Sequence, residues 1–336
     1  MKIVVDAYGG DNAPKAIIEG AIAALNRNNI KDFTIVLTGK SQEIEKILKE
    51  YNYTGDEIEI VDANQVITND DSPTDAIRQK RDSSLVKAFD YLNTNSDAMA
   101  LVSAGSTGAV LTGGVLLLKR IRGIQRPALS PILPTLTGGN VMLIDCGANV
   151  EPKARNLVEF AQMGAVYMQK VYNIDNPRIA LLSNGTEDSK GNTLNKEVFP
   201  LLKESQLNFI GNMEAREILS GDYDVVVADG FSGNIALKAC EGTALSMFSL
   251  IKKGIMSGSL RAKLGYLLLK PVLKDIKKTL DYNDNGGAVL LGLEKVLVKS
   301  HGSSKAKAIC NSILQARDLV ASGVLEKLKE EFTVAK

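Results

Sequence analysis

The stretch DVVVADGFSGNIALKACEG, residues 224–242, indicates how the rest of the chain is organised. Residues 225–228 form a short apolar run rich in valine, which is typical of a strand buried on both faces. A turn of glycine and small polar residues follows at 229–234, and apolar residues with helical spacing come next at 235–241. Such a junction directs free backbone N–H groups above the C-terminal end of the strand, where they can bind an anion. A single junction of this kind is equally compatible with a plain loop.

Four other segments repeat this order of strand, glycine-containing turn and helix. Strand-like runs at 2–5, 98–102, 141–144 and 178–182 lead into the loops DAYGGDNAP, SAGSTGA, DCGANV and SNGTEDSKGN. The alternation of strands with helices predicts right-handed crossovers and a mainly parallel sheet, and therefore an α/β fold. Ligands of open parallel sheets bind above the C-terminal strand ends. We therefore expect the five loops to contribute to one site.

Composition excludes several classes of protein. The 336 residues are 45% hydrophobic, so the chain can bury a large core, and the formal charge of +1 provides no basic field for nucleic acid. The cysteines Cys146, Cys240 and Cys310 match no zinc or redox spacing, and His301 is the only histidine, so we expect no metal. The cysteines are typical of reduced, mostly buried thiols in a cytoplasmic protein. A strand-like start predicts that there is no signal peptide, and the lack of a long uncharged apolar stretch predicts that there is no membrane span.

Nucleotide-binding and nucleophile motifs are missing. No loop has the spacing G-x-G-x-x-G or G-x-S-x-G. Gly39-Lys40-Ser41 resembles the end of a P-loop, but Thr34 stands where that motif needs glycine. The loops instead share small residues, amides, acids and a few cations, which suit a small anion and a carbonyl better than a flat cofactor. We expect no cofactor.

Residues 252–281 differ in character, because lysines and arginine alternate with leucines there. Gly258 and Pro271 are expected to divide the segment into two short helices. Such a basic, leucine-rich hairpin suits an anionic membrane, an acidic protein or the other subunit of a dimer, and the pattern does not choose among them. The candidate surface residues are Arg261, Lys263, Leu267, Leu268 and Lys270. A second, weaker candidate for an acidic partner is the helix face carrying Arg78, Lys80 and Arg81.

Six motifs together carry a resemblance to a known family. In chain order they are DAYGGDNAPKA, SAGSTGA, DCGANVEPK, GTEDSKGN, DVVVADGFSGNIALKACEG and GGAVLLGLEKVLVKSHGSS. In this order, from residue 1 to about residue 317, the chain resembles the bacterial phosphate acyltransferase family, PlsX. The sequence departs from that family at Tyr8, Ser106 and Ser183-Asn184, where methionine, asparagine and Asn-Ile are usual.

The resemblance implies a fold, an activity and a set of partners. The implied fold is a single three-layer α/β/α, Rossmann-like catalytic domain over residues 1–336, related to phosphotransacetylases and isocitrate-type dehydrogenases, with the hairpin protruding. The implied activity makes acyl phosphate from acyl-acyl-carrier-protein and inorganic phosphate, for phospholipid synthesis. The implied protein is a cytoplasmic homodimer associated peripherally with an anionic membrane. A membrane acyl-phosphate:glycerol-3-phosphate acyltransferase is a further implied partner.

Phosphate can attack a thioester directly, so the protein has to bind phosphate, stabilise an oxyanion and help the thiolate leave. We expect Lys190 to bind phosphate as a cation, Asn149 and Asn234 to donate to the oxyanion, and His301 to move the proton. Asp229 either orients these groups or only caps the next helix. Phosphate or substrate is expected at Gly9, Gly10, Asp11, Ser103, Gly105, Thr107, Gly108, Gly147, Gly230 and Gly233.

Two alternatives stay open at this point. One is a phosphotransacetylase-like enzyme that uses acyl-CoA instead of acyl carrier protein. The other is a scaffold of lipid synthesis that docks on the membrane without catalysis. The intact glycine, aspartate and lysine loops argue against the scaffold, which would not need them.

Overall fold

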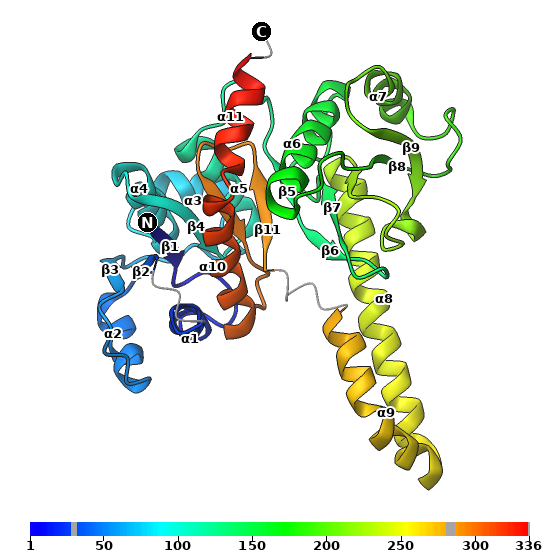
Figure 1. Ribbon diagram of the computed structural model, residues 1–336. Helices are drawn as coiled ribbons and strands as arrows, with labels where there is room; N and C mark the ends of the chain where they lie inside the picture. The colour runs from blue at the N-terminus through cyan, green and yellow to red at the C-terminus, as the bar shows by residue number, and fades with distance from the viewer. Residues whose placement is uncertain (28–31, 280–285, 335–336) are drawn as a thin grey trace.

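The computed structural model describes residues 1–27, 32–279 and 286–334, and it consists of two sheets covered by helices (Figure 1). The elements are, in order, β1 (Lys2–Asp6), α1 (Lys15–Leu25), β2 (Thr34–Gly39), α2 (Ser41–Glu50), β3 (Ile58–Asp62), α3 (Pro73–Gln79), α4 (Ser84–Thr94), β4 (Ala98–Ser103), α5 (Thr107–Gly113), the π-helix η1 (Gly114–Leu118), β5 (Ala128–Ser130), β6 (Ile132–Pro134), β7 (Asn140–Ile144), α6 (Ala154–Tyr172), β8 (Ile179–Ser183), α7 (Thr193–Lys203), β9 (Phe209–Glu214), the 3₁₀-helix η2 (Ala215–Glu217), β10 (Val225–Val227), α8 (Gly230–Ser257), α9 (Leu260–Thr279), β11 (Ala288–Leu291), β12 (Val296–Lys299), α10 (Ala306–Ala321) and α11 (Val324–Val334).

The first sheet has the strand order β3-β2-β1-β4-β12-β11-β5 among the described residues. Its strands from β3 to β12 are parallel, and β11 and β5 are antiparallel to their neighbours. Helices α1 and α10 pack against the face that carries Ile3 and Val5, and α4 covers the face that carries Val4. This alternation buries both faces of β1, as the apolar run Ile3–Val4–Val5 predicts. The result is the predicted three-layer arrangement.

The second sheet has the order β6-β7-β10-β8-β9, in which only β6 pairs in the antiparallel direction among the described strands. Its central strand β10 is the strand of the opening stretch, and its three valines are fully buried. Helices α6 and α7 pack on one face, and the start of α8 packs on the other. The prediction of a mainly parallel α/β fold is confirmed, although the strands are divided between two sheets.

The five predicted junctions all occur, but they are shared between the sheets. The loops after β1 and β4 belong to the first sheet, and those after β7, β8 and β10 belong to the second. One cluster of buried side chains includes Val5 of β1 and Val227 of β10, so the sheets share part of their core. Which loops meet is therefore decided by how the two sheets pack.

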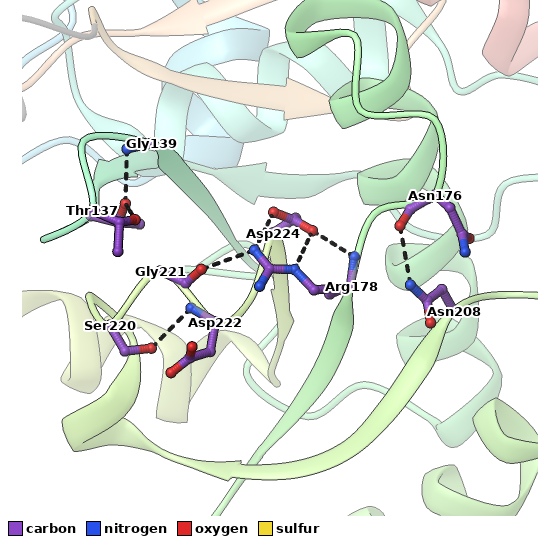
Figure 2. Close-up of polar contacts among 10 residues, drawn as sticks. Thr137, Gly139, Asn176, Arg178, Asn208, Ser220, Gly221, Asp222 and Asp224 are labelled. Atoms are coloured by element: carbon purple, nitrogen blue, oxygen red, sulfur yellow. Dashed lines mark hydrogen bonds and ion pairs between the residues drawn. The ribbon is translucent and has the colours of Figure 1, made fainter.

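An ion pair joins the N-terminal ends of β8 and β10 (Figure 2). The Arg178 guanidinium donates to both carboxylate oxygens of Asp224, each at 3.0 Å, and to the carbonyl oxygen of Gly221 at 2.9 Å. The backbone N–H of Arg178 donates to the same carboxylate at 2.7 Å. This contact lies at the strand ends opposite the glycine loops, so it stabilises the sheet without approaching them.

Helices α8 and α9 extend from the body as a hairpin (Figure 1). Gly258 caps the end of α8, as predicted, but Pro271 lies inside α9 and does not divide the segment. Proline removes one helical hydrogen bond, and at this exposed position water can satisfy the released carbonyl. The last predicted hairpin residues, 280 and 281, lie outside the described residues. No described helix is long and apolar enough to cross a membrane.

Candidate active site

A cavity of about 530 Å³ lies where loops of the two sheets meet. The first sheet and its connections contribute Asp11, Asn69, Gly105, Thr107, Gly286, Gly287, Ala288, Lys299, Ser300, His301 and Gly302. Strand β5 of the first sheet adds Leu129, and the second sheet, the segment that leads into it and helix α8 contribute Pro131, Ile132, Cys146, Gly147, Asn234, Leu237, Lys238 and Glu241. Charged and amide groups therefore share one space with an apolar wall.

Three neighbouring strand ends place Asp6, Ser103 and Lys299 side by side, and Lys299 lines the cavity. Lys299 of β12 is in register with Ser103 of β4, and Asp6 follows the residue of β1 that pairs with Val102. The Ser103 hydroxyl donates to Asp6 Oδ2 at 2.7 Å and accepts the Gly105 backbone N–H at 3.0 Å. The three strand ends thus form a bonded floor under the loop that follows β4.

Lys299 is buried, with 7% of its surface exposed, and it lines the cavity. Burial lowers the pKa of Lys299 to about 8, while the charge of Asp6 opposes this shift. Burial raises the pKa of Asp6, and hydrogen bonds from Ser84 and Ser103 oppose that rise. The Lys299 ammonium donates to the carbonyl oxygen of Ser300. Reasoning from sequence missed Asp6 and Lys299, although a charged residue directly after a buried apolar run was a usable signal.

His301 lies at the exposed rim of the cavity. Its Nδ1 is 2.8 Å from the Ser303 hydroxyl and accepts the Ser303 backbone N–H at 3.2 Å. Because Nδ1 accepts a backbone hydrogen bond, the neutral ring carries its proton on Nε2. Burial, with a contribution from Lys238, lowers the pKa of His301. The neutral ring with an Nε2–H donor is therefore the form at neutral pH.

Helix α8 supplies one wall through Asn234, Leu237, Lys238 and Glu241. Their spacing of three and four residues places all four on one face of the helix. The Lys238 ammonium forms an ion pair with Glu241 at 2.8 Å. Burial raises the pKa of Cys146 well above its usual range, so this cavity thiol is protonated and is a poor nucleophile.

Six of the predicted site residues line the cavity: Asp11, Gly105, Thr107, Gly147, Asn234 and His301. Four others support the loops. A Cβ on Gly9 would lie 2.6 Å from the Gly105 nitrogen, one on Gly10 would lie 2.8 Å from the Gly302 oxygen, and one on Gly108 would meet Pro73 at 2.7 Å. Ser103 belongs to the floor already described.

The loop after β7 and the start of α8 hold one another through hydrogen bonds. The Asn149 amide donates to Pro127 O at 2.8 Å and to Asp145 Oδ2 at 2.9 Å, which occupies both of its N–H groups. The Asp229 carboxylate accepts the backbone N–H groups of Phe231 and Ser232, so it caps α8. Of the two roles expected for Asp229, orienting other groups or capping the next helix, the contacts observed are those of a helix cap.

Two glycines allow this close packing. The Gly230 N–H donates to Asn149 O at 2.7 Å, and a Cβ on Gly230 would lie 2.6 Å from the same oxygen. A Cβ on Gly233 would lie 2.0 Å from the carbonyl oxygen of Asp145. Gly230 and Gly233 do not line the cavity and are placed to let the backbones meet.

Lys190 lies in the loop after β8, outside the residues that line the cavity. Its ammonium is 3.9 Å from Glu187, and Asn184 in the same loop accepts the Gly191 N–H at 2.9 Å. The fourth junction is thus not brought to the cavity with the other four.

The second, weaker candidate surface for an acidic partner carries Arg78, Lys80 and Arg81. In this surface the Lys80 ammonium forms an ion pair with Asp71 at 2.7 Å.

Comparison with known proteins identifies the family. A family model described as "Fatty acid synthesis protein" matches residues 1–327. The chain is 47% identical over 333 residues to the phosphate acyltransferase of Clostridium tetani (strain Massachusetts / E88), covering 98% of each chain. The chain belongs to the phosphate acyltransferase family. The relative from Bacillus pumilus (strain SAFR-032), another phosphate acyltransferase, is 47% identical over 331 residues, which is 98% of this chain and 97% of that one.

The predicted membership of the phosphate acyltransferases is confirmed, and the protein is an acyltransferase enzyme of fatty acid and lipid synthesis. Solved structures confirm the fold. A phosphotransacetylase from Streptococcus pyogenes superposes with a TM-score of 0.59 at 19% identity, covering 95% of this chain and 94% of that one. A branched-chain phosphotransacylase from Enterococcus faecalis V583 gives a TM-score of 0.59 at 15% identity, covering 95% and 99%.

Proposed function

We propose that this phosphate acyltransferase forms acyl phosphate from acyl-acyl-carrier-protein and inorganic phosphate, for phospholipid synthesis. One observation carries the proposal: a single cavity is lined both by polar residues, including Thr107 and His301, and by the apolar side chains of Leu129, Ile132 and Leu237. The polar groups suit phosphate, and the apolar side chains suit the thioester and the first part of an acyl chain. Membership of the phosphate acyltransferase family supports the transfer of an acyl group from a donor to phosphate.

The reaction needs no protein nucleophile. An oxygen of phosphate attacks the thioester carbonyl carbon, a C–O bond forms, and the C–S bond then breaks. The proton lost from phosphate ends on the departing sulfur, so the products are acyl phosphate and the free thiol. The protonated Cys146 is consistent with this direct attack.

Two side chains at the cavity are suited to assist. Nε2–H of His301 donates to the departing sulfur, and Nε2 then recovers the proton that phosphate has lost. The Asn234 amide, on the exposed first turns of α8, donates to the oxyanion of the tetrahedral intermediate. Lys190 as a phosphate-binding cation stays a separate prediction, as do chemical roles for Asn149 and Asp229.

The test measures acyl phosphate directly, as a hydroxylamine-reactive product. We expect it to form from acyl-acyl-carrier-protein only when inorganic phosphate is added. Acyl-CoA with the same acyl chain is the matched donor, and we expect it to have a lower kcat/KM. A clear preference for acyl-CoA would replace this proposal with a phosphotransacetylase-like activity, and no product from either donor would reject both.

We also propose that the α8–α9 hairpin associates with an anionic membrane. Leu260, Leu264, Leu267 and Leu268 are at least 63% exposed and alternate with basic residues, including the predicted surface residues Arg261, Lys263 and Lys270. An exposed apolar surface of this kind is an interaction site, and each cation near an anionic surface contributes about 1 kcal/mol. The predicted homodimer and the membrane acyltransferase that consumes acyl phosphate stay proposals as well.

Co-sedimentation with vesicles tests the membrane proposal. The protein should sediment with vesicles that contain anionic phospholipid and remain in solution with purely zwitterionic ones. The variant Leu267→Ser/Leu268→Ser should lose binding while keeping acyl phosphate formation with a soluble donor. Equal binding of this variant would show that the hairpin does not contact lipid.

A further inference from the structure

We propose that Lys299 is the cation that binds phosphate at the floor of the cavity, and that Asp6 and Ser103 hold it in place. The proposal rests on the proposed function, because it assigns a residue to the phosphate of that reaction. Phosphate, as a small dianion, is the substrate whose charge matches a buried ammonium.

The position of Lys299 is set by the sheet and not by a flexible loop. It is the last residue of β12, in register with Ser103 of β4, and both strands are interior members of the first sheet. Lys299 lines a cavity that is also lined by His301, two residues further along the chain. A phosphate bound there lies close to the group that has to exchange a proton with it.

The burial of Lys299 points to a ligand. An ammonium has three N–H donors, and among the described residues that of Lys299 donates to the carbonyl oxygen of Ser300. Removing a positive charge from water is costly unless an anion and hydrogen bonds compensate for it. Asp6 provides part of the compensation, although its Oδ2 is already bound by Ser103. A phosphate oxygen in the cavity supplies the remainder.

The other lysines near the site are less suited to this task. Lys238 lines the cavity but is paired with Glu241 at 2.8 Å, and its side chain is half exposed. Lys190 lies outside the cavity-lining residues. Lys299 is therefore the cation whose position and burial both favour phosphate.

The decisive variant is Lys299→Met, because methionine keeps the length of the side chain and tolerates burial. We expect its KM for phosphate to rise at least about tenfold while its KM for the acyl donor changes by less than about twofold. The matched control is Lys295→Gln, at the residue that directly precedes the same strand. Lys295 is also partly buried, with Nζ donating to Ala98 O at 2.7 Å, but it lies away from the cavity. Its phosphate KM should equal that of the parent.

A binding measurement without acyl donor separates this inference from the proposed function. Calorimetric titration with inorganic phosphate should give binding to the parent and to Lys295→Gln, and none to Lys299→Met. Circular dichroism of each variant confirms that it is folded. A folded Lys299→Met with the parent's phosphate affinity would overturn the inference. Failure of the parent to make acyl phosphate would overturn the proposed function and leave the titration as an independent result.

If Lys299→Met does not fold, the conservative variant Asp6→Asn takes its place. It keeps the shape of the side chain but removes the charge that supports the ammonium, so phosphate affinity should fall in the same direction. An unchanged affinity in a folded Asp6→Asn would also count against the assignment.

Discussion

Ser103 of β4 donates a 2.7 Å hydrogen bond to the buried carboxylate of Asp6 on the neighbouring strand β1. The same hydroxyl accepts the Gly105 N–H, so it connects the sheet floor to a cavity loop. In Ser103→Ala, a buried carboxylate and a backbone N–H each lose a partner. We expect a loss of about 1–3 kcal/mol in the free energy of unfolding. Urea denaturation measures it, and a stability equal to the parent's would show that water replaces the hydroxyl.

The lowered pKa of Lys299 predicts a pH-dependent stability in the absence of phosphate. The folded protein releases this proton near pH 8, and the unfolded chain near the ordinary value of 10.5. Between these values the unfolded state binds more protons, so this group makes the folded state more stable as pH rises from 8 to 10.5. Asp6 and Asp11 raise the pKa, and Lys238 lowers it.

The measurement compares the parent with Lys299→Met by denaturant unfolding at several pH values. The stability difference between them should shift in favour of the parent by a few kcal/mol across this interval. Added phosphate should reduce the shift, since it stabilises the charged form. A difference that does not depend on pH would mean that Lys299 titrates normally.

His301 should be necessary for turnover at neutral pH. His301→Asn removes the Nε2–H donor, and we expect kcat to fall by about 10²-fold or more with a small change in either KM. Because burial lowers the pKa of His301, the parent should keep its kcat to a pH below the ordinary value of 6.5 before the ring becomes charged. Ser303→Ala is the control, because the backbone N–H that orients Nδ1 remains. Full activity of His301→Asn would leave this residue without a catalytic role.

Lys190 offers a direct comparison between two lysines. If the Lys190 ammonium binds phosphate, Lys190→Ala should raise the KM for phosphate. We expect the rise to be smaller than for Lys299→Met, because Lys190 lies outside the cavity-lining residues and near Glu187. Steady-state kinetics with phosphate as the varied substrate measures both. A larger effect at Lys190 would place the phosphate toward the loop after β8.

The ion pair between Arg178 and Asp224 should affect stability and leave catalysis unchanged. Arg178→Met leaves the largely buried Asp224 carboxylate without its guanidinium, at a cost of about 2 kcal/mol or more. The contact joins the N-terminal ends of β8 and β10 (Figure 2), and neither Arg178 nor Asp224 lines the cavity, so kcat of the folded variant should match the parent. Thermal unfolding and the acyl phosphate assay at low temperature test the two statements separately.

Much of the architecture was predictable from local patterns. The valine run before Asp229 predicted a buried strand, and β10 is that strand. Helix limits were harder to predict: residues 235–241 were expected to be helical, but α8 runs from Gly230 to Ser257. Pro271 was misjudged because a helix at an exposed position can tolerate the hydrogen bond that proline removes. The sequence predicted that five glycine loops contribute to one site, and four of them contribute residues to the cavity while the loop after β8 does not.

The alternation of buried runs, glycine turns and amphipathic segments is a property of residues near one another in the chain, so the order of the elements, the α/β class and the resemblance to phosphate acyltransferases follow from the sequence. The packing of two sheets against each other depends on contacts between residues far apart in the chain. The pairing of β1, β4 and β12 within the first sheet placed Lys299 beside Ser103 and Asp6. The packing of the two sheets brought Asn234 and His301 to one cavity and left Lys190 outside it. Only the tertiary structure decided which charged residue is buried at the site, because burial is set by neighbours that no local pattern contains.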